Sequence, residues 1–373
     1  MNHQQLLYKE LEDKTIVWFS DSNEYIVVES LVAQILSLLE RNTEKSEILT
    51  TILREIDIPN QQAKNLIDDV EVLLNTSKKE HEIVEPIIEP NSFELSKFYL
   101  INDFIFQVDF LSEYEVSLVH PKFAHLEIES QEKIDFHYKV YSDENVISFS
   151  INNKIIGSWN LNEVHFFQGK FSMKLVENIH QKNEDEWLGV FHASAISNGK
   201  ESMLFLGDSG NGKSTSLALL QANDYTCLAD DFVPIDAKKQ EVYSFPSAIS
   251  IKKNSLQTLL PLYPELENSA EYHFKKLNKI VRFLPPNNLD YTNHLQCKAL
   301  VFIKYKKDSD LIINELSNIE AFKQLVPDSW LSPIKENADI FLNWFSKLPC
   351  YQLTYSNNQK MIETVSKIFN DDL

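Results

Sequence analysis

Eight residues near the middle of the chain have the types and spacing that phosphate binding requires. They run from Gly207 to Ser214, read Gly-Asp-Ser-Gly-Asn-Gly-Lys-Ser, and fit the pattern of a phosphate loop. In such a loop, backbone N–H groups and the positive end of a helix dipole surround the anion. Lys213 is expected to pair with the β- and γ-phosphates of a nucleotide, and the Ser214 hydroxyl to ligate Mg²⁺. The alternative is a loop that matches by chance.

Glycine usage gives this loop additional weight. The chain has seven glycines, three of them lie in these eight residues, and none follows Gly212. Such a cluster indicates backbone that bends tightly and lets another group come close. The residues expected to contact the nucleotide are Gly207, Asp208, Ser209, Gly210, Asn211, Gly212, Lys213, Ser214 and Thr215.

Two adjacent carboxylates follow the loop. Asp230 and Asp231 lie 17 and 18 residues beyond Lys213, where an apolar strand is predicted to end. The carboxyl ends of such strands open beside a phosphate loop in α/β sheets. One carboxylate could hold Mg²⁺ while the other takes a proton from an incoming hydroxyl. The alternative is a solvated turn.

A histidine and a basic run are weaker candidates. His192 lies 21 residues before Lys213 on a predicted strand, Val190–Ile196, where it suits a hydrogen-bonded core as well as an active site. The densest basic run of the C-terminal half could stabilise phosphate charge, but such runs more often mark a solvated face. It contains Lys275, Lys276, Lys279 and Arg282.

The elements around the loop predict an α/β region over residues 191–373. A strand is expected at Met203–Leu206 before the loop, a helix over Lys213–Gln221 after it, and a strand at Thr226–Ala229 that ends at the carboxylates. A later strand, Ala299–Ile303, and amphipathic helices complete the pattern.

Residues 96–190 read as a β-rich region. Apolar residues alternate over Phe104–Phe110 and Phe136–Val140, and Phe149–Ile156 reads as a hairpin about Asn152 and Asn153. An antiparallel sheet is expected there.

Residues 1–80 read as a separate module. Two apolar runs, Thr15–Phe19 and Tyr25–Val28, flank the turn-prone Ser20–Asn23 and predict a β-hairpin. Three helical patterns follow. Residues 81–95 are charged and contain two prolines, which suits a linker. The predicted fold class is therefore a multidomain protein of α/β and α+β type.

Composition narrows the classes of partner. The 373 residues carry 35 basic and 55 acidic side chains, a net charge of −20 that disfavours nucleic acid and anionic membranes. No stretch approaches the roughly 20 apolar residues of a membrane-spanning helix. Three widely spaced cysteines indicate neither disulfides nor a zinc site, so a cytoplasmic protein without nucleic-acid or membrane partners is expected.

Three segments together resemble the HPr serine kinase family: Phe191–Ala195, Gly207–Ser214 and Leu228–Asp231. The resemblance implies a fold shared with phosphoenolpyruvate carboxykinase, a nucleoside triphosphate with Mg²⁺, transfer to a serine hydroxyl, and a possible homo-oligomer. It also implies that Asp230 is the base, that Asp231 is the metal partner and that His192 supports the base.

One departure from this family concerns the reverse reaction. HPr kinases carry a glycine-containing signature after the aspartates that serves phosphorolysis, whereas this chain has no glycine after Gly212. The segments Ser244–Ile249 and Val281–Pro286 look more like the HPr-kinase-related proteins found beside peptide-modifying enzymes.

The first 80 residues are similar to PqqD, a small winged-helix-like domain that recognises leader peptides of modified peptides. The resemblance implies that a leader adds as a strand near Glu24–Val28 and lies against the helix containing Leu66–Leu73. The alternative is a plain winged-helix module for dimerisation or docking.

These observations lead to one main hypothesis and two alternatives. The main hypothesis is a serine kinase that uses Mg²⁺ and ATP, with GTP as an alternative nucleotide, to phosphorylate a peptide or protein. The expected acceptor is a ribosomally made precursor peptide held by the N-terminal domain. The alternatives are a small-molecule kinase on the same fold and a nucleotide-sensing regulator that transfers no phosphate.

Overall fold

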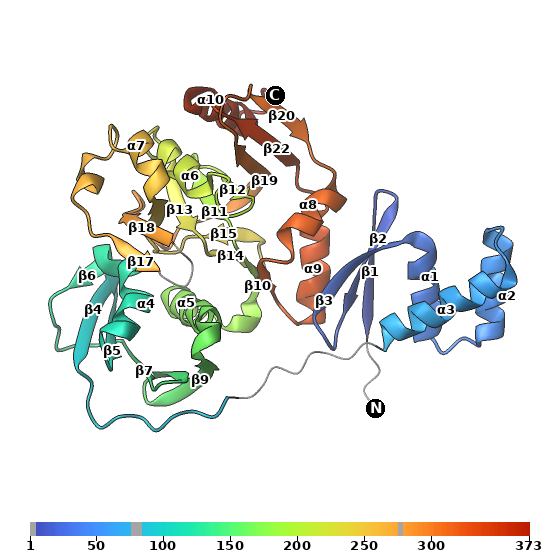
Figure 1. The fold of residues 1–373 in the computed structure, drawn as a ribbon, viewed down its shortest axis with the longest axis horizontal. Coiled ribbons are helices and arrows are strands. Elements are labelled where there is room, and N and C mark those ends of the chain that lie inside the picture. The colour runs from blue at the N-terminus through green and yellow to red at the C-terminus, as the bar shows by residue number, and fades with distance from the viewer. Residues whose placement is uncertain (1–4, 76–83, 275–278) are drawn as a thin grey trace. The chain divides into compact units, whose positions relative to one another are not determined.

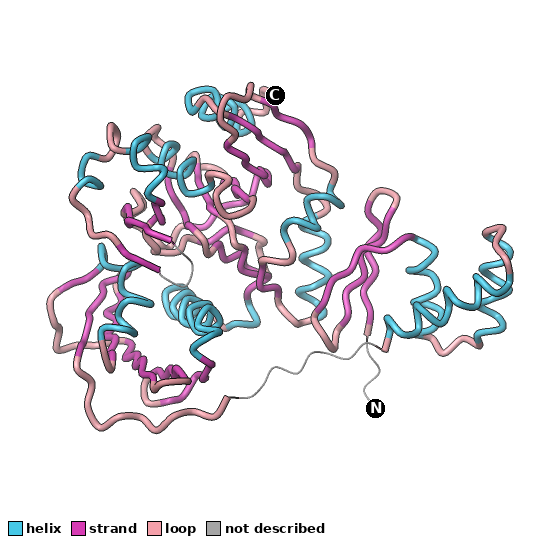
Figure 2. The backbone as a smooth tube through the Cα atoms, viewed as in Figure 1, coloured by secondary structure: helices cyan, strands magenta, loops and turns pink. Residues whose placement is uncertain are grey.

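The computed structural model describes residues 5–75, 84–274 and 279–373, with the side chains of Phe274 and Lys279 left out. The described chain is mixed α/β and divides into two compact units (Figures 1 and 2). The first comprises Met1–His81 together with Leu316–Leu348, and the second comprises Glu82–Glu315 and Pro349–Leu373. The compact unit at the N-terminus therefore includes a segment from far along the chain.

The first unit contains a three-stranded antiparallel sheet and three helices that follow it. The predicted hairpin is present as β2 and β3, and the strand β1 before it was not predicted, because Leu6–Leu11 mixes polar and apolar residues without regular alternation. The elements are β1 (Leu6–Leu11), β2 (Lys14–Phe19), β3 (Glu24–Glu29), α1 (Ser30–Glu40), α2 (Lys45–Glu55) and α3 (Asn60–Leu74).

Both faces of this sheet are covered within the first unit. One face contributes Val17 and Phe19 to a core with helices α1 to α3. On the other face, the ring of Tyr25 packs edge-on against Phe322 and Phe341, at centroid distances of 6.0 and 5.6 Å. The distant segment supplies these partners through α8 (Asn318–Leu325), β21 (Ser329–Leu331) and α9 (Lys335–Phe345).

The second unit begins with a six-stranded sheet in the order β6-β4-β5-β7-β8-β9. The expectation of an antiparallel sheet is wrong at one pair, because β5 and β7 run parallel. Helix α4 crosses over between them, and a crossover returns the chain in the same direction. The elements are β4 (Leu95–Ile101), β5 (Phe104–Phe110), α4 (Glu113–Phe123), β6 (Glu127–Ile128), β7 (Phe136–Ser142), β8 (Val146–Ile151), β9 (Lys154–Asn160) and α5 (Val164–His180).

The larger sheet of the second unit carries the predicted phosphate loop. Among the strands of this unit its order is β13-β11-β12-β19-β15-β14-β10, and β22 pairs with β19 and with β20. Strands β12, β19 and β22 are parallel neighbours. The strands are β10 (Trp187–Phe191), β11 (Ser194–Ser197), β12 (Ser202–Leu206), β13 (Thr226–Asp230), β14 (Val233–Asp236), β15 (Glu241–Tyr243), β19 (His294–Tyr305), β20 (Ile312–Glu315) and β22 (Cys350–Tyr355).

Helices and a small sheet complete this unit. Helix α6 begins and ends where the sequence predicted, and its buried side joins α10 and the central strands in one apolar core. The small antiparallel sheet has the order β16-β18-β17. The elements are α6 (Lys213–Gln221), β16 (Ile249–Lys252), α7 (Leu256–Leu259), β17 (Tyr272–Phe274), β18 (Lys279–Leu284) and α10 (Asn358–Phe369).

Among the helices that the structure describes, none is both long and apolar enough to cross a bilayer.

Candidate active site

The loop between β12 and α6 has the backbone of an anion cradle. Gly207, Gly210 and Gly212 have φ values of +129°, +102° and +97°, a region that residues with a Cβ rarely adopt. At Gly207 a Cβ would also lie 2.8 Å from the carbonyl oxygen of Ile303. At Gly210, by contrast, a Cβ would meet no atom within 4 Å. The loop is therefore packed against β19 at its start and open at its middle, which fits the approach of a phosphate group.

The lysine and the serine that end the predicted loop both make hydrogen bonds in the candidate site. Lys213 is only 6% exposed, and its ammonium group donates a hydrogen bond to the carbonyl of Gly207. The hydroxyl of Ser214 donates to Oδ1 of Asp230 over 3.3 Å. The structure thus brings the loop and the first of the two predicted carboxylates together.

Asp230 is almost completely buried at the end of β13. Its carboxylate accepts hydrogen bonds from the Ser194 hydroxyl at 2.6 Å and from the backbone N–H of Ser250 at 3.1 Å, besides the bond from Ser214. Burial, and next the charge of Asp231, raise the pKa of Asp230 to about 6, although the hydrogen bonds act in the opposite direction. This carboxyl group therefore changes its charge close to neutral pH.

Asp231 and His192 form a second, more accessible pair. The side chain of Asp231 is 26% exposed and that of His192 is 43% exposed, and Oδ1 of the first lies 4.0 Å from Nδ1 of the second. Pairing of β11 with β13 places Ser194 opposite Asp230. His192 and Asp231, which lie near this pair in the sequence, are brought close together in the same way. This separation is within ion-pair range but longer than a hydrogen bond, so the two groups are neighbours without a direct hydrogen bond. A histidine beside a carboxylate can support its action as a base.

The prediction of one continuous strand through His192 is wrong. Strand β10 ends at Phe191 and β11 begins at Ser194, and the N–H of Ala193 turns back to the carbonyl of Phe191 at 2.9 Å. The bend takes His192 out of the sheet, which removes the alternative of a core histidine.

Sequence reasoning missed a second lysine beside the loop. Lys252 ends β16, and its ammonium group donates to the Ser209 hydroxyl at 2.8 Å. The same strand supplies the Ser250 N–H that binds Asp230, and just before it the Ser247 hydroxyl donates to the Asp230 carbonyl at 3.0 Å. The spacing of residues in the sequence does not identify Lys252, because its contact with Ser209 joins segments 43 residues apart that only the tertiary fold brings together.

The predicted basic run does not supply a site cation among the residues that can be described. Arg282 donates to the carbonyls of Leu266 and Glu267 and to the carboxylate of Glu271, so its guanidinium is used within the fold. Lys275 and Lys276 lie outside the described residues, as does the side chain of Lys279.

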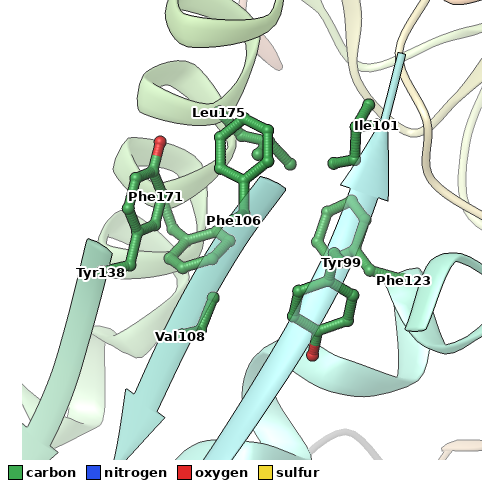
Figure 3. A pocket seen from close by; sticks show the side chains of 8 residues that line it. All are labelled: Tyr99, Ile101, Phe106, Val108, Phe123, Tyr138, Phe171 and Leu175. Atoms are coloured by element: carbon green, nitrogen blue, oxygen red, sulfur yellow. The ribbon is translucent and has the colours of Figure 1, made fainter. Parts of the chain in front are cut away.

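A separate crevice lies in the β-rich part of the second unit. Its lining is apolar and aromatic and comes from β4, β5, β7, α4 and α5 (Figure 3). It leaves room for little more than one water molecule. The crevice is therefore a packing gap of the core. Its lining residues are Tyr99, Ile101, Phe106, Val108, Phe123, Tyr138, Phe171 and Leu175.

The expected peptide-docking surface consists of β3 and α3. Strand β3 is at one edge of its sheet in the strand order, and on α3 the side chain of Val72 is 68% exposed. The apolar side chains of β3 are largely used within the unit: Tyr25 packs against Phe322 and Phe341, and Ile26 and Val28 pack against the core with helices α1 to α3. What this surface can offer a peptide is thus the backbone edge of β3 and the exposed side of α3.

No protein-family model matches the chain, and no curated protein matches it. Across residues 5–75, 84–274 and 279–373, His, Cys, Asp and Glu side chains form no group of three or more that could hold a metal ion. Magnesium that is bound with phosphate needs only one or two carboxylates, because it keeps several waters. The pair formed by Ser214 and Asp230 fits that requirement.

Proposed function

We propose that this protein is an ATP- and Mg²⁺-dependent kinase that phosphorylates a serine hydroxyl of a peptide or protein, with a precursor peptide held by its N-terminal unit as the acceptor. The observation that carries the proposal is the contact between the Ser214 hydroxyl and the buried Asp230 carboxylate. It joins the loop lysine, the loop serine and the carboxylate pair into one site of the kind that transfers phosphoryl groups.

The geometry favours a division of labour opposite to the one that the family resemblance implies. Asp230 is buried, and its oxygens already face Ser194, Ser214 and the Ser250 N–H, which suits a partner of a metal ion. Asp231 is more exposed and has His192 beside it, which suits the removal of a proton from an incoming hydroxyl. We therefore assign the metal-facing role to Asp230 and the base role to Asp231.

Each of the other residues has a defined task in this scheme. Bound Mg²⁺ would supply neutralisation of phosphate charge in the site. Lys213, at the start of α6, and Lys252, at the end of β16, both place their ammonium groups at the loop. There they stabilise the charge of the phosphoryl group. Asp231 takes the hydroxyl proton while the acceptor oxygen forms its bond to phosphorus, and the bond from phosphorus to the nucleoside diphosphate breaks.

The N-terminal unit supports a peptide as the acceptor. An edge strand followed by a helical surface can bind an extended chain through backbone hydrogen bonds. A peptide tethered in this way has a high effective concentration at the catalytic site.

The test measures phosphate transfer by the full-length protein. Radiolabelled ATP, Mg²⁺ and a serine-containing precursor peptide encoded beside the gene are incubated with the protein, and the same peptide without its leader and free serine are the comparison acceptors. We expect label in the leader-bearing peptide and a rate that falls about 100-fold or more in Asp231→Asn. Asparagine tolerates the φ of +62° at this position, so the backbone should be kept.

Three outcomes would contradict parts of the proposal. Equal transfer to free serine would indicate a small-molecule kinase, and nucleotide binding without transfer to any acceptor would indicate a regulator. Full activity in Asp231→Asn together with loss in Asp230→Asn, at unchanged nucleotide affinity, would restore the roles that the family resemblance implies.

A further inference from the structure

The two sides of the phosphate loop differ in what they offer a nucleotide. In the sheet order, β11 and then β13 with Asp230 lie on one side of β12, whereas β19 and then β22 lie on the other. The carboxylates that serve the reacting phosphate are thus confined to one side. The rest of a nucleotide must leave the loop elsewhere, and the side of β19 and β22 is the one without carboxylates from β13.

The last residue of β19 is an exposed aromatic that touches the loop. The N–H of Tyr305 donates to the Asn211 carbonyl at 2.9 Å, and a Cβ at Gly212 would lie 3.3 Å from the Cβ of Tyr305. The residue nevertheless remains 46% exposed. A ligand that covered this exposed part of the ring would gain favourable burial of aromatic surface.

A second tyrosine packs against this ring. Tyr355, at the end of β22, is 1% exposed and its hydroxyl lies 2.8 Å from that of Ser216 in α6. The rings of Tyr305 and Tyr355 pack edge to face, with centroids 5.5 Å apart and an angle of 74°. Tyr305 therefore packs against a buried ring and still has exposed surface that a ligand can contact.

The charges beside Tyr305 suit an anionic ligand. Lys304 and Lys306 flank it in sequence and both are exposed, and Lys307 follows. In a chain of net charge −20, these three lysines form a local excess of positive charge beside Tyr305 in the sequence, although Asp308 and Asp310 follow them.

We propose that Tyr305 is the stacking surface for the nucleobase of the nucleotide that the loop binds, an inference that rests on the proposed nucleotide-dependent function. Every nucleobase has a π-face, so stacking on Tyr305 accepts adenine and guanine alike. Base stacking on an aromatic side chain corresponds to roughly a tenfold change in affinity, or more.

The test compares ligands with and without a base on the full-length protein. Dissociation constants for ATP, GTP and inorganic triphosphate, each with Mg²⁺, are measured by calorimetry for the wild type, Tyr305→Ala and Tyr305→Phe. We expect Tyr305→Ala to weaken ATP and GTP about tenfold and to leave triphosphate within about twofold, while Tyr305→Phe binds like the wild type. Tyr114→Ala, at a 40% exposed tyrosine of α4, is the matched control.

The possible failures are distinguishable. If Tyr305→Ala weakens all three ligands equally, the side chain shapes the loop and the stacking assignment is overturned. If none changes while the wild type binds ATP, the base lies elsewhere and only this inference fails. If the wild type binds neither ATP nor triphosphate, the proposed function fails and the inference fails with it. Thermal unfolding of each variant separates these results from misfolding.

Discussion

At the scale of single residues, the site depends on a carboxyl group whose charge changes near neutral pH. Burial raises the pKa of Asp230 to about 6, so the proton is held in the folded protein at pH values where an unfolded chain has lost it. The sign follows directly: ionisation of Asp230 costs folding free energy as the pH rises from about 4 towards 6, and a bound cation would offset that cost.

The raised pKa of Asp230 predicts how nucleotide binding depends on pH. Between pH 5 and about 7, the affinity for Mg²⁺-ATP should rise because Asp230 loses its proton. In Asp230→Asn that rise should be largely absent, and the affinity should stay near the low value of the wild type at pH 5. Calorimetric titrations at several pH values measure both. An identical pH dependence in the wild type and the variant would show that Asp230 does not face the metal.

Two loop glycines give a matched pair of substitutions. Both have positive φ, but a Cβ at Gly207 would collide with the Ile303 carbonyl whereas one at Gly210 has open space. Gly207→Ala should therefore lower the free energy of unfolding by about 2–3 kcal/mol and abolish nucleotide binding, and Gly210→Ala should lower it by about 1 kcal/mol. Urea unfolding and ATP titration test this, and equal losses at the two positions would argue against the packing of the loop on β19.

At the scale of elements, strand β16 contacts both parts of the proposed catalytic site. It contacts Asp230 through the Ser250 N–H and the loop through the Lys252 ammonium group. Lys252→Ala should therefore reduce the rate of phosphoryl transfer by about tenfold to a hundredfold, because a cation beside the phosphate is lost. Lys253→Ala, at the exposed neighbour that follows, should change the rate less than twofold. If the two substitutions reduce the rate equally in a transfer assay, Lys252 acts only through its contribution to the overall charge and not through its position at the loop.

The elements also show which features a sequence can predict. Local signals were sufficient for α6, whose bounds follow from the loop and the apolar pattern, and for the β8–β9 hairpin, where Asn152 and Asn153 adopt the positive φ of a primed turn. Features that depend on contacts between distant segments were missed: the parallel pairing of β5 with β7, and the approach of Lys252 to the loop. The interruption of the strand at His192 was not predicted either, because an apolar run does not show where a strand bends.

At the scale of the whole molecule, the N-terminal residues and the segment 316–348 belong to one compact unit. Tyr25 contacts Phe322 and Phe341, and Lys9 donates to the side chain of Asn343 at 2.7 Å. The sequence suggested a module that ends near residue 80, and no local signal connects it with a segment more than 200 residues later. Removal of residues 1–80 alone would therefore uncover the aromatic side chains of α8 and α9.

The fold suggests how to remove both segments of this unit. Segment 316–348 connects β20 to β22, and these strands pair antiparallel with Glu315 opposite Tyr351. Because the two ends of the segment are neighbours in the ladder, a short Asn-Gly turn can replace it. The double excision removes residues 1–81 and replaces 316–348. The resulting protein should be soluble and monomeric, with an affinity for Mg²⁺-ATP within about threefold of the wild type.

The simple truncation and the double excision should behave differently. The protein that lacks only residues 1–80 should aggregate or unfold at a lower temperature, because Phe322 and Phe341 lose the ring that covers them. The double excision should keep nucleotide binding but lose transfer to the leader-bearing peptide, since the β3 edge is gone. Size-exclusion chromatography, thermal unfolding and the radiolabel assay distinguish the two proteins. If the double excision still phosphorylates the peptide in a leader-dependent manner, the leader binds the catalytic unit itself and the N-terminal unit has another role.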